Sequence, residues 1–207
     1  MTAFHTETID SFLEALGSAA PVPGGGGAAG LMGAQACALG EMVANLTISN
    51  KEYAKVAADA AGWVETCRVG RSIMLDLMDI DAKNFNALMD TLHLPKKTEE
   101  EKKTRDEALQ AAYKKAIEAP CQMADTMCRM LELFTQILMN GNKNVLTDSM
   151  IALLCAQASM RAAFLNIRIN LKCIHDDFYC ADKEASITEW ENGIEHVDAI
   201  LTYQVKI

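Results

Sequence analysis

The stretch MLDLMDIDAKNFNAL at residues 74–88 sets the expectation for the fold. Its apolar side chains recur every three or four positions, as one face of an α-helix requires; they are Met74, Leu77, Met78, Phe85 and Leu88. No proline occurs between Lys51 and Leu92, and turn-forming residues are few. The pattern therefore predicts one long helix across this segment, or two helices with a break near Gly70.

The same periodicity extends outward on both sides of this stretch. We expect helices at residues 9–16, from 28 to about 46, from 98 to 139 with a kink or division at Pro120, from 148 to about 173, and from 186 to 203. Thr98 and Glu101 form a capping box at the start of the third of these helices. No segment alternates with a period of two. The sequence thus predicts an all-α fold, an up-and-down bundle of long helices with no sheet, in a single domain over residues 1–207.

Composition narrows the classes of function. Half of the 207 residues are hydrophobic, which permits a sizeable core, and the net charge of −9 argues against nucleic acid or an anionic membrane as a partner. Seven cysteines without a CxxC motif, and a start without a signal-peptide pattern, predict a cytoplasmic protein with reduced thiols. The uncharged run 17–40 contains Pro21, Pro23 and four consecutive glycines, so we do not expect it to span a membrane.

Asp81 is the most informative polar residue, because it falls inside the apolar stripe of residues 74–88. At about 100° per residue, Asp76 and Asp79 rotate well away from that stripe. An acid on a core-facing stripe resists ionisation through desolvation, which suits a general acid near neutral pH. A buried aspartate satisfied by a neighbouring helix terminus is the structural alternative.

Residues 24–27 are four consecutive glycines that lead into the helix expected from Ala28. Residues 25–30 match G-x-G-x-x-G, but no strand precedes them, so we do not expect a dinucleotide site. A glycine loop at the start of a helix still exposes backbone N–H groups and lets a ligand approach closely. A flexible turn between helices is the alternative interpretation.

Asn166 and Asn170 continue a polar seam with Ser159 and Ala163 on an otherwise apolar helix. Paired amides four residues apart suit recognition of the edge of a heterocycle, although bundle cores also use them to fix register. Asp148 most simply caps the start of that helix. The four histidines make no metal-ligand pattern, so we expect no metal site.

Several separated motifs, taken together and in order, resemble the formimidoyltetrahydrofolate cyclodeaminase family. They are PGGG at 23–26, DIDA at 79–82 with Phe85, LPK at 94–96, EEK at 100–102 with Arg105, GN at 141–142 with Asp148, and N-x-x-x-N-L at 166–171. The resemblance covers nearly the whole chain. It implies an all-helical fold, a homodimer and a folate substrate.

The resemblance also implies roles for the matching residues. Asp81 is implied as the proton donor when 5-formimidoyltetrahydrofolate closes to 5,10-methenyltetrahydrofolate and releases ammonia. Asp148 is expected to contribute similarly or to orient the pterin, with Asn166 and Asn170 nearby. The other expected substrate-binding residues are Gly24, Gly25, Gly26, Gly27 and Asn142, with Lys96 and Lys102 meeting the glutamyl tail. Neither a metal nor an organic cofactor is expected.

Two positions depart from the family pattern. Gly27 stands where Ser is frequent, so a role for that position rests on its backbone alone, and Thr147 stands where Ser is common but keeps a hydroxyl. Some stand-alone members of the family are methenyltetrahydrofolate cyclohydrolases, which add water to the same cation and give 10-formyltetrahydrofolate. We expect the cyclodeaminase first and keep the cyclohydrolase as the alternative. A non-catalytic helical module that binds a folate or a protein is the rival from another class.

Overall fold

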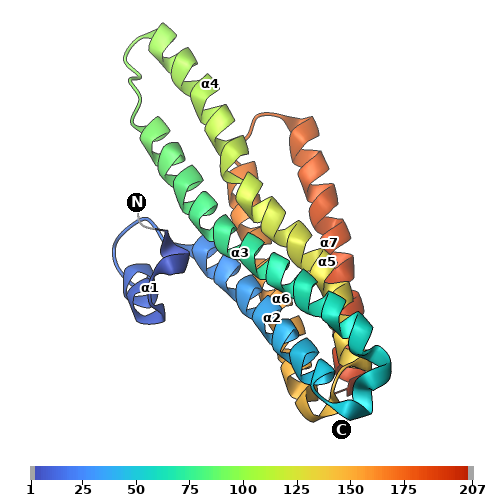
Figure 1. Ribbon diagram of the computed structural model, residues 1–207. Helices are drawn as coiled ribbons and strands as arrows, with labels where there is room; N and C mark the ends of the chain where they lie inside the picture. Colours follow the sequence, from blue (N-terminus) through green and yellow to red (C-terminus); the bar gives the residue numbers. More distant parts are fainter. Residues whose placement is uncertain (1–2, 205–207) are drawn as a thin grey trace.

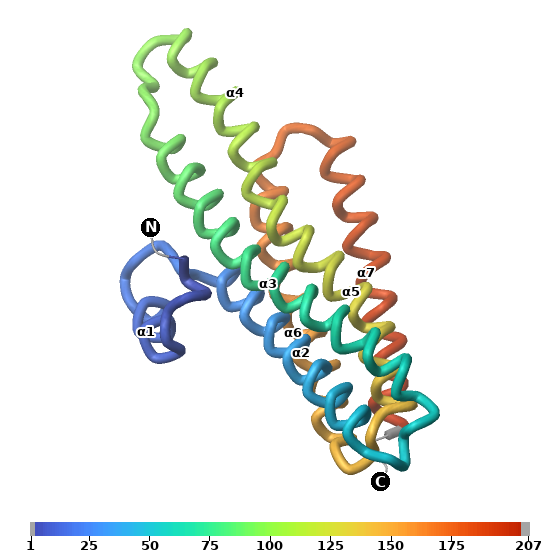
Figure 2. The backbone as a smooth tube through the Cα atoms, in the orientation of Figure 1, coloured from blue at the N-terminus to red at the C-terminus, as the bar shows by residue number. Residues whose placement is uncertain are grey.

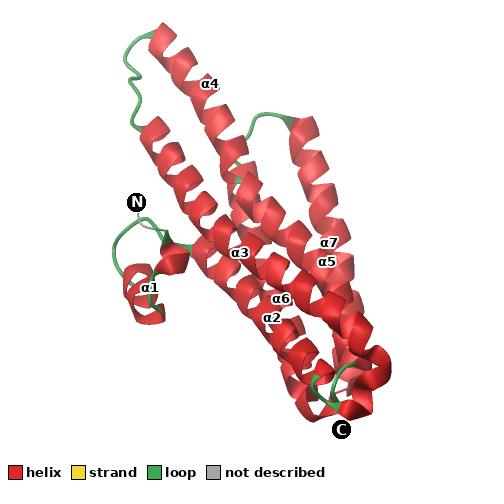
Figure 3. Ribbon diagram, viewed as in Figure 1, coloured by secondary structure: helices red, strands yellow, loops and turns green. Residues whose placement is uncertain are grey.

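The computed structural model describes residues 3–204, and every regular element within them is a helix (Figure 1 and Figure 3). The long elements are α1 (Ile9–Leu16), α2 (Gly25–Ile48), α3 (Ala57–Leu92), α4 (Glu99–Ala116), α5 (Glu118–Asn140), α6 (Leu146–Leu171) and α7 (Asp177–Gln204). Short 3-10 helices are η1 (Phe4–Thr6), η2 (Lys51–Val56) and η3 (Lys143–Val145). Helices α2, α3, α5 and α6 pack together as the core. The predicted all-α bundle without a sheet is confirmed for the described residues.

α3 is one uninterrupted helix of 36 residues, so the alternative with a break near Gly70 is wrong. Gly70 instead permits close packing, because a Cβ there would lie 3.1 Å from the Cys37 sulfur on α2. The helix also starts later than Lys51. Residues 51–56 form η2, where Tyr53 has non-helical angles (φ −100°, ψ 19°).

The expected division near Pro120 is present. α4 ends at Ala116 and α5 begins at Glu118, which places Pro120 in the first turn of α5, where a helix has no use for its N–H. The capping box is also present: Glu101 N–H donates to Thr98 Oγ1 (3.1 Å), and Thr98 N–H donates to Glu101 Oε2 (3.0 Å).

Three other helix starts differ from the prediction. α2 begins at Gly25, so three of the four glycines form its first turn rather than a loop. α6 begins at Leu146, so Asp148 lies inside its first turn rather than at the N-cap. In the first turn the negative charge of Asp148 still interacts favourably with the helix dipole. α7 begins at Asp177, well before the predicted Ser186. Tertiary packing outweighs local propensity at such ends.

Glycines on α2 bring α3 into close contact. A Cβ would lie 2.4 Å from Met78 Cγ at Gly30, and 2.4 Å from Met74 Cε at Gly33. The methionines of the sequence-defined stripe therefore occupy the space that these glycines leave. These contacts fix the axial position of α3 relative to α2. They thereby also fix the positions of the later residues on the same face of α3.

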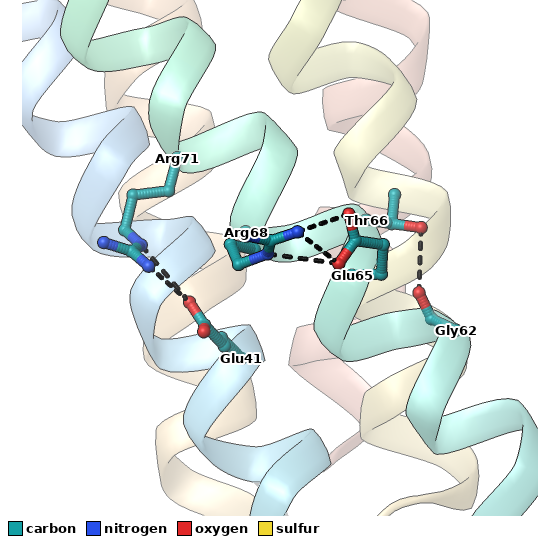
Figure 4. A network of polar contacts seen from close by, with 6 residues as sticks. All are labelled: Glu41, Gly62, Glu65, Thr66, Arg68 and Arg71. Atoms are coloured by element: carbon teal, nitrogen blue, oxygen red, sulfur yellow. Dashed lines mark hydrogen bonds and ion pairs between the residues drawn. The ribbon is translucent and has the colours of Figure 1, made fainter.

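Polar contacts join the same two helices at their outer edge (Figure 4). Arg71 of α3 forms an ion pair with Glu41 of α2 at 3.1 Å, whereas Arg68 pairs with Glu65 within α3 at 2.8 Å. All four side chains are at least partly exposed, so each pair contributes about 1 kcal/mol or less. The register of α2 and α3 thus depends on the buried glycine–methionine contacts.

The thiols are free at all seven cysteines. Burial, together with the neighbouring Cys67 and Glu41, raises the pKa of Cys37 to about 12, and burial raises the pKa of Cys67 to about 12. These two thiols are therefore unreactive core residues near neutral pH.

α1 stands apart from the bundle, beside the start of α2 (Figure 1 and Figure 2). Only Phe12 of its predicted apolar face is buried, whereas Ile9 is 77% exposed and Leu13 is 52% exposed. At the same end of the molecule, α3 and α4 extend past the start of α2 as a hairpin (Figure 2). The start of α2 therefore lies in the angle between a projecting arm and a projecting hairpin.

By length and composition alone, α2 and the segment 143–171 would both qualify as membrane spans. About half of each is buried inside the bundle, 44% and 50% of the most apolar window. Burial of this kind is what core helices of a globular domain show.

Candidate active site

The first turn of α2 lies directly against Asp81 of α3. A Cβ on Gly26 would lie 2.0 Å from Asp81 Oδ2 and 2.2 Å from its Cγ, so a glycine at this position leaves room for the carboxyl group. Asp81 follows Met74 and Met78 along the stripe of α3 that packs on α2. The position of Asp81 within that stripe, which the sequence predicts, therefore places it at this first turn of α2. The turn consists of Gly25, Gly26 and Gly27 and is here called the glycine turn.

Burial raises the pKa of Asp81 to about 6 from an ordinary value of 3.8. Desolvation is the cause, and no hydrogen bond or cation from the described residues offsets it. A carboxyl group with a pKa near 6 has both protonation states available near neutral pH. Asp81 can therefore both accept and donate a proton, which an ordinary exposed aspartate does poorly.

Asn166 on α6 lies on the other side of the glycine turn. A Cβ on Gly25 would lie 3.5 Å from Asn166 Oδ1. The Nδ2 groups donate along their own helix, from Asn166 to Ala162 O (3.1 Å) and from Asn170 to Asn166 O (2.8 Å). Each Oδ1 is left as an acceptor without a partner in the described part of the chain. No side chain caps α2 at Gly24, so its first N–H groups are donors that the helix leaves unused.

Asn142 and Asp148 lie at the opposite end of the bundle. Asn142 N–H donates to Thr47 Oγ1 (2.9 Å), and its Nδ2 donates to a carbonyl at the end of α2 (3.1 Å). Asp148 is about 27 Å from Asn166 along α6, at a rise of about 1.5 Å per residue. The expected proximity of Asp148 to Asn166 is therefore wrong within one chain, and Asn142 fastens a loop to α2 there.

Lys96 and Lys102 lie at the tip of the α3–α4 hairpin. α3 alone extends about 16 Å beyond Asp81 before the hairpin loop begins. Both lysines are exposed, and Lys102 Nζ pairs with Glu99 Oε1 at 2.6 Å. Neither lysine reaches the carboxyl group of Asp81. Only an extended part of a ligand bound at Asp81 would therefore contact the two lysines.

Two residues near the site had no predicted contact. Ser159 Oγ donates to Ala29 O at 2.7 Å, which sets the height of α6, and so of Asn166, against α2. Asp79 accepts hydrogen bonds from the N-terminal segment. Their partners are 130 and about 75 positions away in the sequence, so no local pattern announces either contact.

Comparison with known proteins identifies the family of this chain. A model of the formiminotransferase-cyclodeaminase family matches residues 8–189, a range that includes the glycine turn, Asp81 and all of α6. The chain belongs to this family. The match confirms the resemblance drawn from the separated motifs.

This chain is similar over most of its length to two relatives and to one solved structure. It is 38% identical over 177 residues to methenyltetrahydrofolate cyclohydrolase of Methylorubrum extorquens, covering 86% of this chain and 85% of that one. It is 27% identical over 172 residues to rat formimidoyltransferase-cyclodeaminase, covering 83% of this chain but about a third (32%) of the rat protein. The crystal structure of formiminotetrahydrofolate cyclodeaminase from Thermotoga maritima superposes with a TM-score of 0.86 at 28% identity, covering 97% and 96% of the two chains.

These relatives are named enzymes of folate one-carbon chemistry. The protein is accordingly a folate-dependent one-carbon enzyme rather than a non-catalytic helical module. Its all-helical fold is that of the cyclodeaminases.

Proposed function

We propose that this enzyme adds water to the methenyl carbon of 5,10-methenyltetrahydrofolate and gives 10-formyltetrahydrofolate. The observation that carries the proposal is Asp81, a desolvated acid with a pKa near 6, beside a glycine turn that also lies against the Asn166 amide oxygen. The Methylorubrum relative named for this reaction is 38% identical over most of both chains. That identity favours the cyclohydrolase over the cyclodeaminase that the motifs alone put first.

Asp81 performs both proton transfers in this scheme. As the carboxylate, it takes a proton from the attacking water while the new C–O bond converts the methenyl cation to a neutral carbinolamine. The protonated acid then gives that proton to N5 as the C–N5 bond breaks, and the hydroxyl proton leaves to solvent. One cation and one water thus become the 10-formyl product and one proton. A pKa near 6 suits both transfers, because neither protonation state is rare near neutral pH.

The remaining residues bind and orient the folate. The Oδ1 atoms of Asn166 and Asn170 accept hydrogen bonds from the pterin, and the first N–H groups of α2 donate to its acceptors. Lys96 and Lys102 contribute the positive charge that attracts the carboxylates of an extended glutamyl tail. We propose that no metal or organic cofactor takes part and that the enzyme is cytoplasmic, where free thiols persist.

The second candidate reaction is cyclodeamination of 5-formimidoyltetrahydrofolate, which the name of the Thermotoga structure supports. N10 attacks the amidine carbon, and the N10 proton moves to the imine nitrogen, which becomes an amino group. The protonated Asp81 then gives its proton to this group so that it leaves as ammonia. The resulting carboxylate stabilises the methenyl cation. The two tetrahedral intermediates differ by NH₂ against OH on one carbon, so one acid serves either reaction.

Two assays on the purified protein test the proposal. One starts from 5,10-methenyltetrahydrofolate and follows the loss of its absorbance above the spontaneous rate. The other starts from 5-formimidoyltetrahydrofolate and follows ammonia release together with the rise in methenyl absorbance. We expect enzyme-dependent methenyl loss without ammonia release. Ammonia release would assign the cyclodeaminase instead, and activity in neither assay would contradict the proposed function.

We also propose that the enzyme is a homodimer that pairs through α6. An exposed apolar stripe runs along this helix, formed by Ile151, Leu154, Leu165 and Ile169, with Leu165 70% exposed. Ala158 lies exposed at its middle and permits close approach. A two-fold axis near Ala158 would set each α6 antiparallel to its copy. In that arrangement the partner's Asp148 lies level with this chain's Asn166 along α6. Asp148 would then lie near the pterin, although within one chain it lies at the opposite end of the bundle.

Sedimentation of the purified protein checks the dimer. We expect a mass of twice 22.6 kDa for the wild type and of one chain for Leu165→Glu, because the new charge would be buried in the interface. Phe178→Glu is the matched control, since Phe178 is 87% exposed on α7 rather than on α6, and should leave the dimer intact. A 22.6 kDa wild type, or no effect of Leu165→Glu, would contradict the proposed interface.

Mixing two inactive variants checks whether Asp148 acts across that interface. A mixture of Asp81→Asn and Asp148→Asn chains forms hybrid dimers with one intact site if each site takes Asp81 from one chain and Asp148 from the other. Random reassortment of subunits should then restore about a quarter of the wild-type activity. No recovery from chains shown to exchange would contradict a role for Asp148 across the interface.

A further inference from the structure

The N-terminal arm, residues 3–23, is fastened to α3 by one carboxylate. Phe4 N–H donates to Asp79 Oδ1 at 2.7 Å, and His5 Nδ1 lies 2.5 Å from Asp79 Oδ2. Adjacent residues of the arm thus engage both oxygens of Asp79. The side chains of His5 and Asp79 are only 30% and 26% exposed, so water competes less for this contact than it would for a fully exposed ion pair.

The contact of Phe4 and His5 with Asp79 is here called the Asp79 clasp. The arm connects this clasp to the glycine turn. The Phe4 ring packs edge-to-face on Phe12, with ring centroids 6.4 Å apart. Phe12 is buried against the turn, where a Cβ on Gly27 would lie 3.8 Å from its ring and 3.2 Å from Pro23 Cβ. A continuous chain of contacts therefore runs from Asp79 through two aromatic rings to the first turn of α2.

Little else holds the arm in this position. Ile9 and Leu13, which would normally anchor α1, face solvent. A cavity of about 120 Å³ lies between the arm and the side chains of Leu31, Leu75 and Met78, so part of the underside of the arm lacks packing partners. The seating of the arm thus depends mainly on Phe12 and on the Asp79 clasp.

We propose that Asp79 is a positioning residue for the Asp81 site. The two aspartates are two positions apart on α3 and point about 160° apart around it. Asp81 faces the glycine turn directly, and Asp79 supports the same turn from outside by holding the arm against it. The part of this proposal that concerns folate binding rests on the proposed function, whereas the part that concerns the arm does not.

Hydrogen exchange of the whole 207-residue chain, read by mass spectrometry, tests the coupling without an activity assay. Asp79→Ala should speed exchange about tenfold or more in residues 9–17 of the arm and in residues 28–30 of α2, since charge-assisted hydrogen bonds are stronger than neutral ones. Asp79→Asn keeps one acceptor for Phe4 N–H and should lie between Asp79→Ala and the wild type. Asp76→Ala removes an exposed aspartate from the same helix and should match the wild type.

Kinetics on the folate that the wild type turns over provide the second readout. Asp79→Ala should raise KM about tenfold and leave kcat within about threefold, because the binding turn is displaced while the proton donor is intact. Faster exchange confined to residues 4–8, with residues 28–30 and KM unchanged, would overturn the proposal. If the wild type turns over neither folate, the proposed function fails, and the exchange experiment still decides whether Asp79 supports the turn.

Discussion

Asp81→Asn is expected to lower turnover by about 10²–10⁴-fold while the bundle stays folded. Asparagine has the same shape and fits the space beside Gly26, but it cannot take a proton from water or give one to N5. The initial rate of methenyl loss at pH 7, compared with the wild type at equal concentration, measures the effect. A variant within threefold of the wild type would show that another group transfers the protons.

The same variant should be more stable than the wild type above pH 6. Because folding raises the pKa of Asp81 from 3.8 to about 6, the folded chain binds more protons than the unfolded chain between these values. The wild type therefore loses stability as the pH rises from about 4 to about 6, by at most about 3 kcal/mol before allowance for solvent screening. Asparagine avoids this loss, so the difference in melting temperature should appear at pH 7.5 and vanish at pH 4. A less stable variant at pH 7.5 would indicate a purely structural aspartate.

Gly26→Ala is expected to abolish most activity with a smaller effect on stability. Its Cβ would lie 2.0 Å from Asp81 Oδ2, a separation that no relaxed structure keeps. The short carboxyl side chain can rotate away more easily than two long helices can separate, so the acid leaves its position and the fold survives. We expect a loss of about 100-fold or more in kcat, since small displacements of a catalytic group cost this much.

Gly62→Ala is the matched control for this substitution. Gly62 also lies in a helix, but nothing lies within 4 Å of a Cβ added there, and its carbonyl keeps its bond from Thr66 (Figure 4). The control should keep full activity and gain about 0.5–1 kcal/mol of stability from helix propensity. Full activity in Gly26→Ala would mean that the carboxyl group of Asp81 does not act from its position beside the turn.

Much of the fold follows from local patterns in the sequence. The stripe of residues 74–88 predicts both the long helix and the inward direction of Asp81, because a period of 3.6 residues fixes which side chains share a face. Pro120 and the Thr98 capping box mark ends that depend on neighbours a few positions away. These features need no knowledge of the tertiary structure.

Other features depend on packing between distant segments. The glycines at 25–27 look like a loop on propensity alone, yet they form a helical turn, with Asn166 of α6, Asp81 of α3 and Phe12 of α1 packed around it. Ile9 and Leu13 on the apolar face of α1 stay exposed although its periodicity is clear, since only Phe12 of this face is buried against the start of α2. The separation of Asp148 from Asn166 follows from both lying on one straight helix. The motifs gather these residues by family resemblance, whereas only the structure shows how far apart they are.

Titration of the Asp81 carboxyl group most directly tests the central claim, that the glycine turn makes this aspartate a weak acid suited to proton transfer. Carbon-13 NMR of protein labelled at the aspartate carboxyl carbon would follow each group with pH, and Asp81→Asn would assign the resonance. We predict that one signal titrates near pH 6 and is missing from the variant. A resonance assigned to Asp81 that titrates near pH 4, like an exposed aspartate, would contradict the claim.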